Sequence, residues 1–248
     1  YADETGYRSG TEDLEGRYKI PPYFACDSFV DDEIGKVLDA VDEHAPDALV
    51  IYTSDHGEMM WAHRINSKGP VMYEQITRIP FIVRGPSIPS GLVDTDPVGH
   101  IDVMPTILDY LGVERPPILQ GESLLPRLAG DGGQEGPVFV EFNRHNVGNN
   151  SYGGFKPIRC AVDGRYKLVL NLLHTDEFYN LETDPDDLDN RIEDDVLAEV
   201  RDRLQEQLLC WMDEVRDPFR GPEWRYRPWA NQGEPKWPKG RVNRPGDG

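Results

Sequence analysis

The chain has 248 residues and 38% hydrophobic content, which is enough to bury one core, or a main core with a smaller one beside it. Its formal net charge of -19 and its pI near 4.6 argue against binding to nucleic acid or to an anionic membrane, because the negative field repels polyanions. No run of about 18 apolar residues occurs, so we expect no membrane-spanning helix.

Acidic residues and cysteines bear on the compartment. The acidic residues are spread along the whole chain, which is typical of a solvated surface and also of proteins from a salty cytoplasm. Cys26, Cys160 and Cys210 lie far apart, so we expect buried thiols rather than disulfides or a Cys-x-x-Cys metal site. The sequence begins at Tyr1 without a methionine or a leader. We therefore expect the gene product to start upstream, and we favour a cytoplasmic location.

The first expected helix begins near Asp27 and ends before Pro46. Ser28 followed by Asp31 resembles a capping box at its start, whereas residues 1–22 are polar and lack a helical period. The apolar residues that recur at helical spacing are Val30, Ile34, Val37, Leu38 and Val41.

Two short apolar runs follow, and each is typical of a strand that is buried on both faces of a parallel sheet. They are residues 48–53 and 79–83. After the second run we expect a helix from Val103 to Leu111, which Gly112 ends. Helix, strand, loop, strand and helix in this order predict a doubly wound α/β core, to which we assign residues 1–136.

A small antiparallel sheet with a covering helix is expected over residues 137–216. Asp163-Gly164 is a strong hairpin signal between two of its strands. The expected strands are residues 138–140, 157–162 and 166–170, and the helix carries Ile192, Val196, Val200, Leu204 and Leu208 on one stripe. Residues 217–248 are rich in Pro, Trp and Arg without a period, so this tail should wrap the surface as irregular chain or be disordered.

Polar chemistry begins directly after the first expected strand, in the segment Thr53 to Glu58. In open α/β sheets ligands bind at the carboxyl ends of the strands. Asp55 offers a hard carboxylate and His56 an imidazole, on a turn that Gly57 permits, so both can face one cation. At least two more oxygen donors would have to come from elsewhere. The alternative is a strand-ending turn with a capping Asp and a solvated His.

A lysine and a histidine follow in the same loop. A fixed ammonium such as that of Lys68 is tolerated near a divalent cation only if an anion lies between them, which suits a sulfate or phosphate group. His63 could donate a proton to the leaving oxygen or hold the ester oxygen. Taken singly, Lys68 could instead be a solvated charge, and His63 could be a satisfied polar group.

These residues lie in passages that resemble, in order, the sulfatase family of the alkaline phosphatase superfamily. The passages are residues 53–86, 23–35, 100–106, 166–167 and 176–185. The resemblance implies a partial alkaline phosphatase-like doubly wound sheet followed by the small antiparallel sheet. It also implies that Asp55 and His56 are metal ligands, that Lys68 binds the sulfate, and that His63 is a substrate-side residue. The implied metal is Ca²⁺, with Mn²⁺ or Mg²⁺ open because of His56. His100 and Asp102 are interpreted as structural, with Asp102 capping the next helix.

One part of the family pattern does not occur in the sequence. There is no Cys/Ser-x-Pro-x-Arg segment to supply the formylglycine nucleophile, and the family's early acidic pair and early His-x-Pro segment, which precede the equivalent of Tyr1, are also missing. We therefore expect an amino-terminal half outside this chain, and expect the chain alone to be inactive. The predicted function is metal-dependent hydrolysis of a small-molecule sulfate monoester. The alternatives are a phosphodiester or phosphonate monoester hydrolase, a non-catalytic fragment, and one chain of a proteolytically cut enzyme. We expect substrate-reading loops around residues 144–152; the oligomeric state is not predicted.

Overall fold

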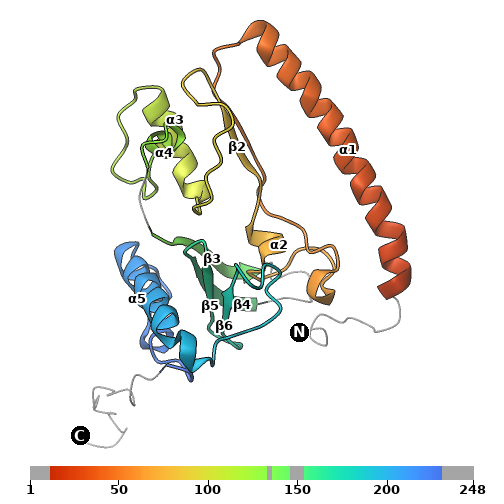
Figure 1. The fold of residues 1–248 in the computed structure, drawn as a ribbon. Coiled ribbons are helices and arrows are strands. Elements are labelled where there is room, and N and C mark those ends of the chain that lie inside the picture. Colours follow the sequence, from red (N-terminus) through yellow and green to blue (C-terminus); the bar gives the residue numbers. More distant parts are fainter. Residues whose placement is uncertain (1–11, 133–135, 146–153, 231–248) are drawn as a thin grey trace, which may run out of the picture.

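The computed structural model describes residues 12–132, 136–145 and 154–230. One part of the molecule holds the long helix α1, a two-stranded sheet and the short helices α3 and α4, and the other holds a four-stranded sheet with the helix α5 against it (Figure 1). Helix α2 (Glu74–Thr77) lies where the two parts meet. Among the described helices, none has the length and apolar content required to cross a membrane.

Helix α1 (Glu12–His44) is longer than the sequence pattern predicts. Its predicted start at Ser28 was wrong, because the hydroxyl of Ser28 donates to the carbonyl of Phe24 from within the helix, at 3.0 Å. The additional residues, 12–26, include Pro21 and Pro22 inside the helix, but Glu, Leu, Arg and Lys among them are good helix formers. The predicted end ahead of Pro46 is confirmed.

Strands β1 (Val50–Thr53) and β2 (Phe81–Arg84) confirm the two short apolar runs, but they pair antiparallel, with Thr53 opposite Phe81. The expectation of parallel strands buried on both faces was wrong for this pair. Tyr52 is 42% exposed and Ile82 is 60% exposed. Within the described residues these two strands form a sheet of their own, and Tyr52 and Ile82, which are partners across it, lie on an exposed face.

The segment after β2 leads through the short turn η2 (His100–Asp102) into α3 (Val103–Tyr110), and α4 (Leu125–Leu128) follows. Gly112, with φ of 64°, ends α3 as predicted. Asp102 stands at the N-cap position, but its carboxylate does not cap α3. It accepts from the backbone N–H groups of Gly99 at 3.0 Å and Glu122 at 2.9 Å, and so ties two loops together.

The four-stranded sheet is antiparallel throughout, in the order β3 (Val138–His145), β4 (Gly154–Val162), β5 (Tyr166–Asn171) and β6 (Glu177–Asn180). The hairpin between β4 and β5 is confirmed: Gly164 has φ of 90°, and the carboxylate of Asp163 accepts from the backbone N–H of Tyr166 at 2.7 Å. Strand β6 was not predicted separately.

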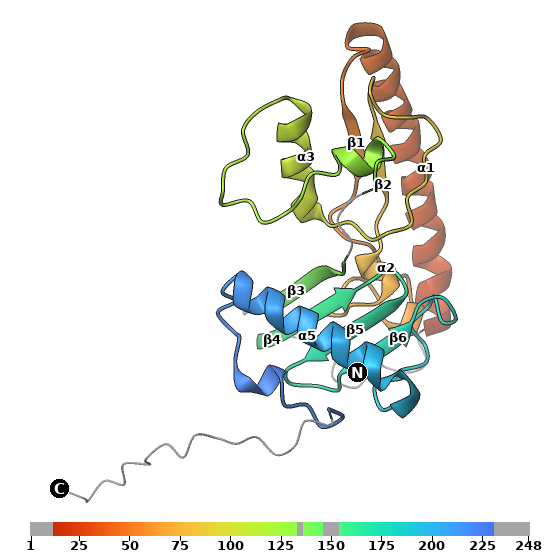
Figure 2. The ribbon, with the colours of Figure 1, turned by 60° about the vertical axis from the view of Figure 1, so that its left-hand side comes forward.

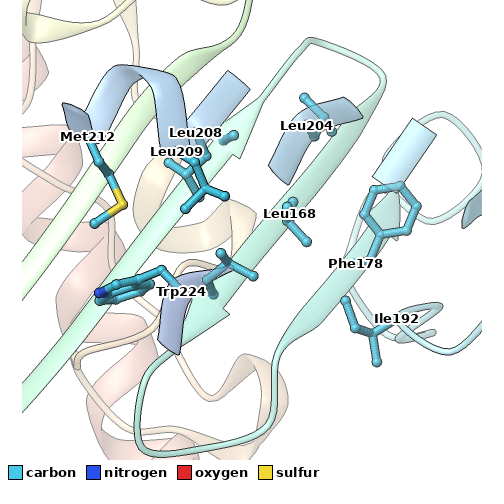
Figure 3. Close-up of a cluster of buried hydrophobic side chains, with 10 residues drawn as sticks. Leu168, Phe178, Ile192, Leu204, Leu208, Leu209, Met212 and Trp224 are labelled. Atoms are coloured by element: carbon cyan, nitrogen blue, oxygen red, sulfur yellow. The ribbon is translucent and has the colours of Figure 1, made fainter. Parts of the chain in front are cut away.

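Helix α5 (Ala198–Glu214) crosses one face of this sheet (Figure 2). Its Leu204 and Leu208 are fully buried against Leu168 and Phe178, as predicted (Figure 3). The predicted stripe was wrong at its beginning, because Val196 lies ahead of the helix in the turn η3 (Asp195–Leu197) and is 88% exposed. The buried cluster is completed by Ala161, Leu170, Ile192, Leu209, Met212 and Trp224.

The first part of the tail wraps the small sheet, as expected. The turn η4 (Pro222–Trp224) brings Trp224 into the core, and Trp229 packs against its edge. Residues 231–248 of the tail and most of the stretch 144–152 lie outside the described residues. The expectation of three buried thiols holds only for Cys160, because Cys26 and Cys210 are on exposed faces of their helices.

Candidate functional site

The candidate site lies in the loop that follows β1. Gly57 fixes this loop against α2: its N–H donates to the carbonyl of Ile76 at 2.9 Å. A Cβ at position 57 would lie 1.9 Å from the carbonyl oxygen of Gln75. Only glycine allows so close a backbone approach, so α2 determines where the preceding residues stand.

His56 and Lys68 are in direct contact, although twelve residues separate them along the chain. The Nζ of Lys68 lies 2.8 Å from Nε2 of His56, and Nδ1 of His56 lies 2.8 Å from the carbonyl oxygen of Gly57. A carbonyl only accepts, so we assign the imidazole proton to Nδ1. The Nε2 lone pair then points to the side where the ammonium lies. This is the tautomer in which Nε2 can also bind a metal ion.

Asp55 completes this small group. Its Oδ2 lies 3.4 Å from Nε2 of His56, and its side chain is 82% exposed. The backbone N–H of His56 donates to Oδ1 at 2.9 Å. This hydrogen bond, with the nearby His56 and Lys68, holds the pKa of Asp55 below its usual value. The carboxylate is therefore ionised and open to a cation. The structure thus brings together the three residues Asp55, His56 and Lys68.

The donor set fits a divalent cation in kind but not in number. A carboxylate oxygen beside an imidazole nitrogen suits Mn²⁺, Mg²⁺ or Ca²⁺, whereas Ca²⁺ takes six to eight oxygen ligands. No group of three or more His, Cys, Asp and Glu side chains that could hold a metal ion is found in the described parts of the chain. Asp55 and His56 can therefore supply only part of such a centre.

His63 is placed differently from the other predicted site residues. Its Nε2 lies 2.8 Å from the carbonyl oxygen of Asp186, and its ring stacks on that of Tyr73 with 3.8 Å between centroids. No hydrogen bond links His63 to Asp55, His56 or Lys68 within the described residues. His63 thus joins the Lys68 loop to the segment after β6.

His100 lies at the other side of the site loop. Its Nε2 is 3.4 Å from the hydroxyl of Thr53, the last residue of β1. This contact joins the turn η2 to the strand that precedes Asp55. It is a position that supports the loop, in keeping with the structural interpretation.

A buried ion cluster below α2 was not predicted from the sequence. The ammonium of Lys167 lies 2.9 Å from Asp187 and 2.5 Å from Glu74, and donates to the carbonyl of Met72 at 3.1 Å. The backbone N–H of Glu74 donates to the same Asp187 carboxylate at 2.7 Å. Burial lowers the pKa of Lys167, but the two carboxylates outweigh it and the pKa is raised. The cluster fastens α2, and with it Gly57, to the four-stranded sheet.

Known sequence families agree with this arrangement. The model of the family "Sulfatase" matches residues 1–113, and that of "N-sulphoglucosamine sulphohydrolase, C-terminal" matches residues 62–214. The second match alone covers more than half of the chain. The chain therefore belongs to the sulfatase family, which generally uses a divalent metal ion and formylglycine.

Individual relatives agree as well. The chain is 47% identical over 235 residues to an uncharacterized sulfatase, YidJ, of Escherichia coli K12, covering 94% of this chain and 46% of that protein. It is 32% identical over 176 residues to the choline-sulfatase of Rhizobium meliloti, covering 69% of this chain and 32% of that protein. The chain thus spans less than half of the length of these relatives.

Two solved structures show the same fold. One is BT4656 in complex with its substrate D-glucosamine-2-N,6-O-disulfate, with a TM-score of 0.67 and 26% identity over 76% of this chain and 39% of that one. The other is a phosphonate monoester hydrolase of Agrobacterium radiobacter, with a TM-score of 0.64 and 29% identity over 75% of this chain and 39% of that one. The predicted α/β class with an alkaline phosphatase-like fold is confirmed.

Proposed function

We propose that this chain forms part of the active site of a metal-dependent sulfatase that hydrolyses a sulfate monoester of a small molecule. The observation that carries the proposal is the contact of Lys68 with His56 at 2.8 Å, beside the ionised and exposed Asp55. A carboxylate, an imidazole lone pair and an ammonium converge there at the end of β1. Membership of the sulfatase family supports sulfate as the group that lies between them.

Asp55 and His56 would hold the divalent cation through a carboxylate oxygen and Nε2. When bound, such an ion polarises the sulfate and offsets the charge that develops on its oxygens. Ca²⁺ is our first choice, and Mn²⁺ or Mg²⁺ is the alternative because His56 contributes nitrogen rather than oxygen. The sequence has no precursor motif for formylglycine, so the nucleophile would come from residues outside it.

Lys68 would bind a non-bridging sulfate oxygen. Its exposed ammonium donates to Nε2 of His56 in this structure and would turn from that lone pair to a sulfate oxygen when Nε2 holds the proposed cation. A sulfate oxygen between the two positive charges would take a hydrogen bond from Lys68 and relieve their repulsion. Because this interaction strengthens as negative charge builds up on the oxygen, Lys68 should act mainly on turnover.

His63 would contact the substrate as an acceptor and not as a proton donor. Its Nε2 lies against a carbonyl, so in the neutral ring the proton is on Nε2 and Nδ1 carries the lone pair. Nδ1 could accept from a hydroxyl of the substrate. The two roles considered above, protonating the leaving oxygen and holding the ester oxygen, both need a donor, so a hydroxyl of the alcohol part is the substrate group that fits this lone pair.

The test uses the complete gene product that contains this chain, assayed with 4-nitrophenyl sulfate with and without EDTA. We expect Asp55→Ala to abolish metal-dependent turnover with the fold intact, and Lys68→Ala to lower kcat about 100-fold. Asp39→Ala and Lys36→Ala, on the exposed face of α1, are the matched controls. Full activity of Asp55→Ala would refute the metal assignment, and a change below about threefold for Lys68→Ala would mean that Lys68 is only solvated.

A phosphonate monoester or phosphodiester hydrolase is the second candidate. The structural similarity to the phosphonate monoester hydrolase of Agrobacterium radiobacter favours it, since its TM-score is close to that of BT4656. The ratio of kcat/KM for 4-nitrophenyl sulfate to that for phenyl 4-nitrophenyl phosphate and phenyl phosphonate monoesters separates the two. No turnover of any of these esters would leave the non-catalytic fragment as the remaining interpretation.

As part of the same proposal, the acidic composition supports the view that the protein works in a cytoplasm of high salt concentration. A net charge of -19 opposes compaction at low ionic strength, and salt screens that repulsion. We expect the unfolding midpoint to rise steadily between low and molar KCl. A midpoint independent of KCl would leave an ordinary solvated surface.

A further inference from the structure

A hollow of about 340 Å³ lies between α1 and the loop that leads to Lys68. Two aromatic side chains, Tyr23 and Trp61, form part of its wall. Three polar side chains, Glu58, Asn66 and Ser67, also line it. Its volume falls at the lower end of the range of roughly 300–1,000 Å³ that is usual for small-ligand pockets, so it suits a ligand of about one ring.

The hollow is continuous with the candidate site along the chain. Glu58 follows Gly57 directly, and Ser67 is bonded to Lys68. The 2.8 Å contact between Lys68 and His56 closes the loop between these two ends. A sulfate held at Lys68 would therefore place its alcohol part beside the hollow.

The backbone of this loop is held in an unusual conformation. Within residues 60–67 five non-glycine residues have positive φ: Met60 (43°), Trp61 (72°), His63 (51°), Arg64 (60°) and Ser67 (68°). Such conformations are costly, and they cluster where a loop is shaped for a ligand. Trp61 and Ser67 are among the residues that line the hollow. The contact of His63 with Asp186 holds the loop in this shape.

The polar side chains of the hollow have unused hydrogen-bonding capacity. In the parts of the chain that the structure describes, no hydrogen bond joins the side chains of Glu58, Asn66 or Ser67 to another residue. A carboxylate, an amide and a hydroxyl beside two aromatic rings match the hydroxyl groups and the apolar face of a sugar ring.

We propose that this hollow binds the alcohol part of the ester and that this part is a single sugar ring, uncharged apart from its sulfate. An aryl alcohol would leave the amide and the carboxylate desolvated without partners, which disfavours it. The carboxylate of Glu58 would repel a second anionic group on the sugar. The inference rests on the proposed sulfatase function and specifies its substrate class.

The test compares glucose 6-sulfate with 4-nitrophenyl sulfate in the complete gene product. For the wild type, we expect a higher kcat/KM with glucose 6-sulfate than with 4-nitrophenyl sulfate. Asn66→Ala should lower the ratio of the two kcat/KM values about tenfold, which is the factor for one lost hydrogen bond, and Glu58→Gln should lower it by about the same factor because a charged acceptor becomes a neutral one. Glu43→Gln on α1 and Tyr52→Ala on β1, both exposed and outside the hollow, should leave the ratio unchanged.

Failure of this inference and failure of the proposed function give different results. Hydrolysis of 4-nitrophenyl sulfate without hydrolysis of glucose 6-sulfate, or a ratio that Asn66→Ala and Glu58→Gln leave unchanged, overturns the sugar assignment and retains the sulfatase. Loss of both activities in a variant, accompanied by a lower unfolding midpoint, assigns that side chain to the fold and equally overturns its contact with sugar. No hydrolysis of either ester by the wild type overturns both proposals.

Discussion

Replacing Lys167 by methionine tests how the small sheet supports the site. The Lys167 side chain is completely buried, between a fully buried Asp187 and a Glu74 side chain that is 15% exposed. Methionine has a similar volume and fills the same space without a charge. The variant therefore removes the ammonium and leaves two carboxylates facing each other in a buried place.

The size of the effect follows from this arrangement. Removing one partner of a buried ion pair lowers the free energy of unfolding by about 3–5 kcal/mol. Because Lys167→Met also leaves the carboxylates of Glu74 and Asp187 to repel each other, we expect a loss near the upper end of this range. Asp187→Asn leaves the contact of Lys167 with Glu74 in place and should cost only about 1–2 kcal/mol. Because the two residues share contacts, the double variant should be less destabilised than the sum of the single variants.

Urea unfolding followed by circular dichroism measures these differences, with Lys36→Met on the exposed face of α1 as the control. The same protein samples should be titrated with Ca²⁺ or Mn²⁺, because displacement of α2 would move Gly57 and the adjacent His56. We expect weaker metal binding by Lys167→Met under conditions in which it remains folded. A loss of less than about 1 kcal/mol for this variant would show that the cluster does not fasten α2.

Two other changes have defined outcomes. Burial raises the pKa of Glu177 to about 7, while the hydrogen bond from Tyr179 opposes this. The folded-state pKa of Glu177 lies above its unfolded value of about 4.3. The protonated side chain therefore stabilises the fold fully below about pH 4.3, and this stabilisation is lost as the pH rises through 7. Glu177→Gln should therefore flatten a fall in unfolding free energy of roughly 3 kcal/mol between pH 5 and pH 8, and an unchanged slope would contradict the cause given. Gly57→Ala places a Cβ 1.9 Å from the carbonyl oxygen of Gln75, so we expect a loss of about 1–3 kcal/mol and weaker metal binding, and wild-type values for both would show that α2 can move aside.

The candidate site could be predicted from the sequence where its chemistry is local. Asp55 and His56 are neighbours on a turn after an apolar strand, and Lys68 follows in the same loop. Lys68 contacts His56 as soon as the loop between them folds back toward the end of β1. The hairpin at Asp163 was predictable for the same reason, because its turn residues and its hydrogen bonds lie within four positions.

Long-range contacts could not be predicted in this way. His63 meets Asp186, 123 positions later, and nothing in the residues around His63 indicates that its ring is turned toward the small sheet. Lys167 stands in a strand where a lysine would ordinarily face water, and its burial depends on carboxylates from two other segments. The antiparallel pairing of β1 with β2 likewise depends on the path of the chain between them rather than on their apolar character.

The strained loop and the buried ion cluster have to be considered together. A segment with five positive φ angles keeps its shape only if its surroundings hold it. The small sheet provides this support at two points, through Asp186 at His63 and through Asp187 at Glu74. These adjacent residues belong to the loop after β6, and Asp187 itself has a positive φ of 54°. The antiparallel sheet is therefore more than a cover for a hydrophobic core: it sets the position of the loop that joins His56 to Lys68, and changes in its core should be felt at the candidate site.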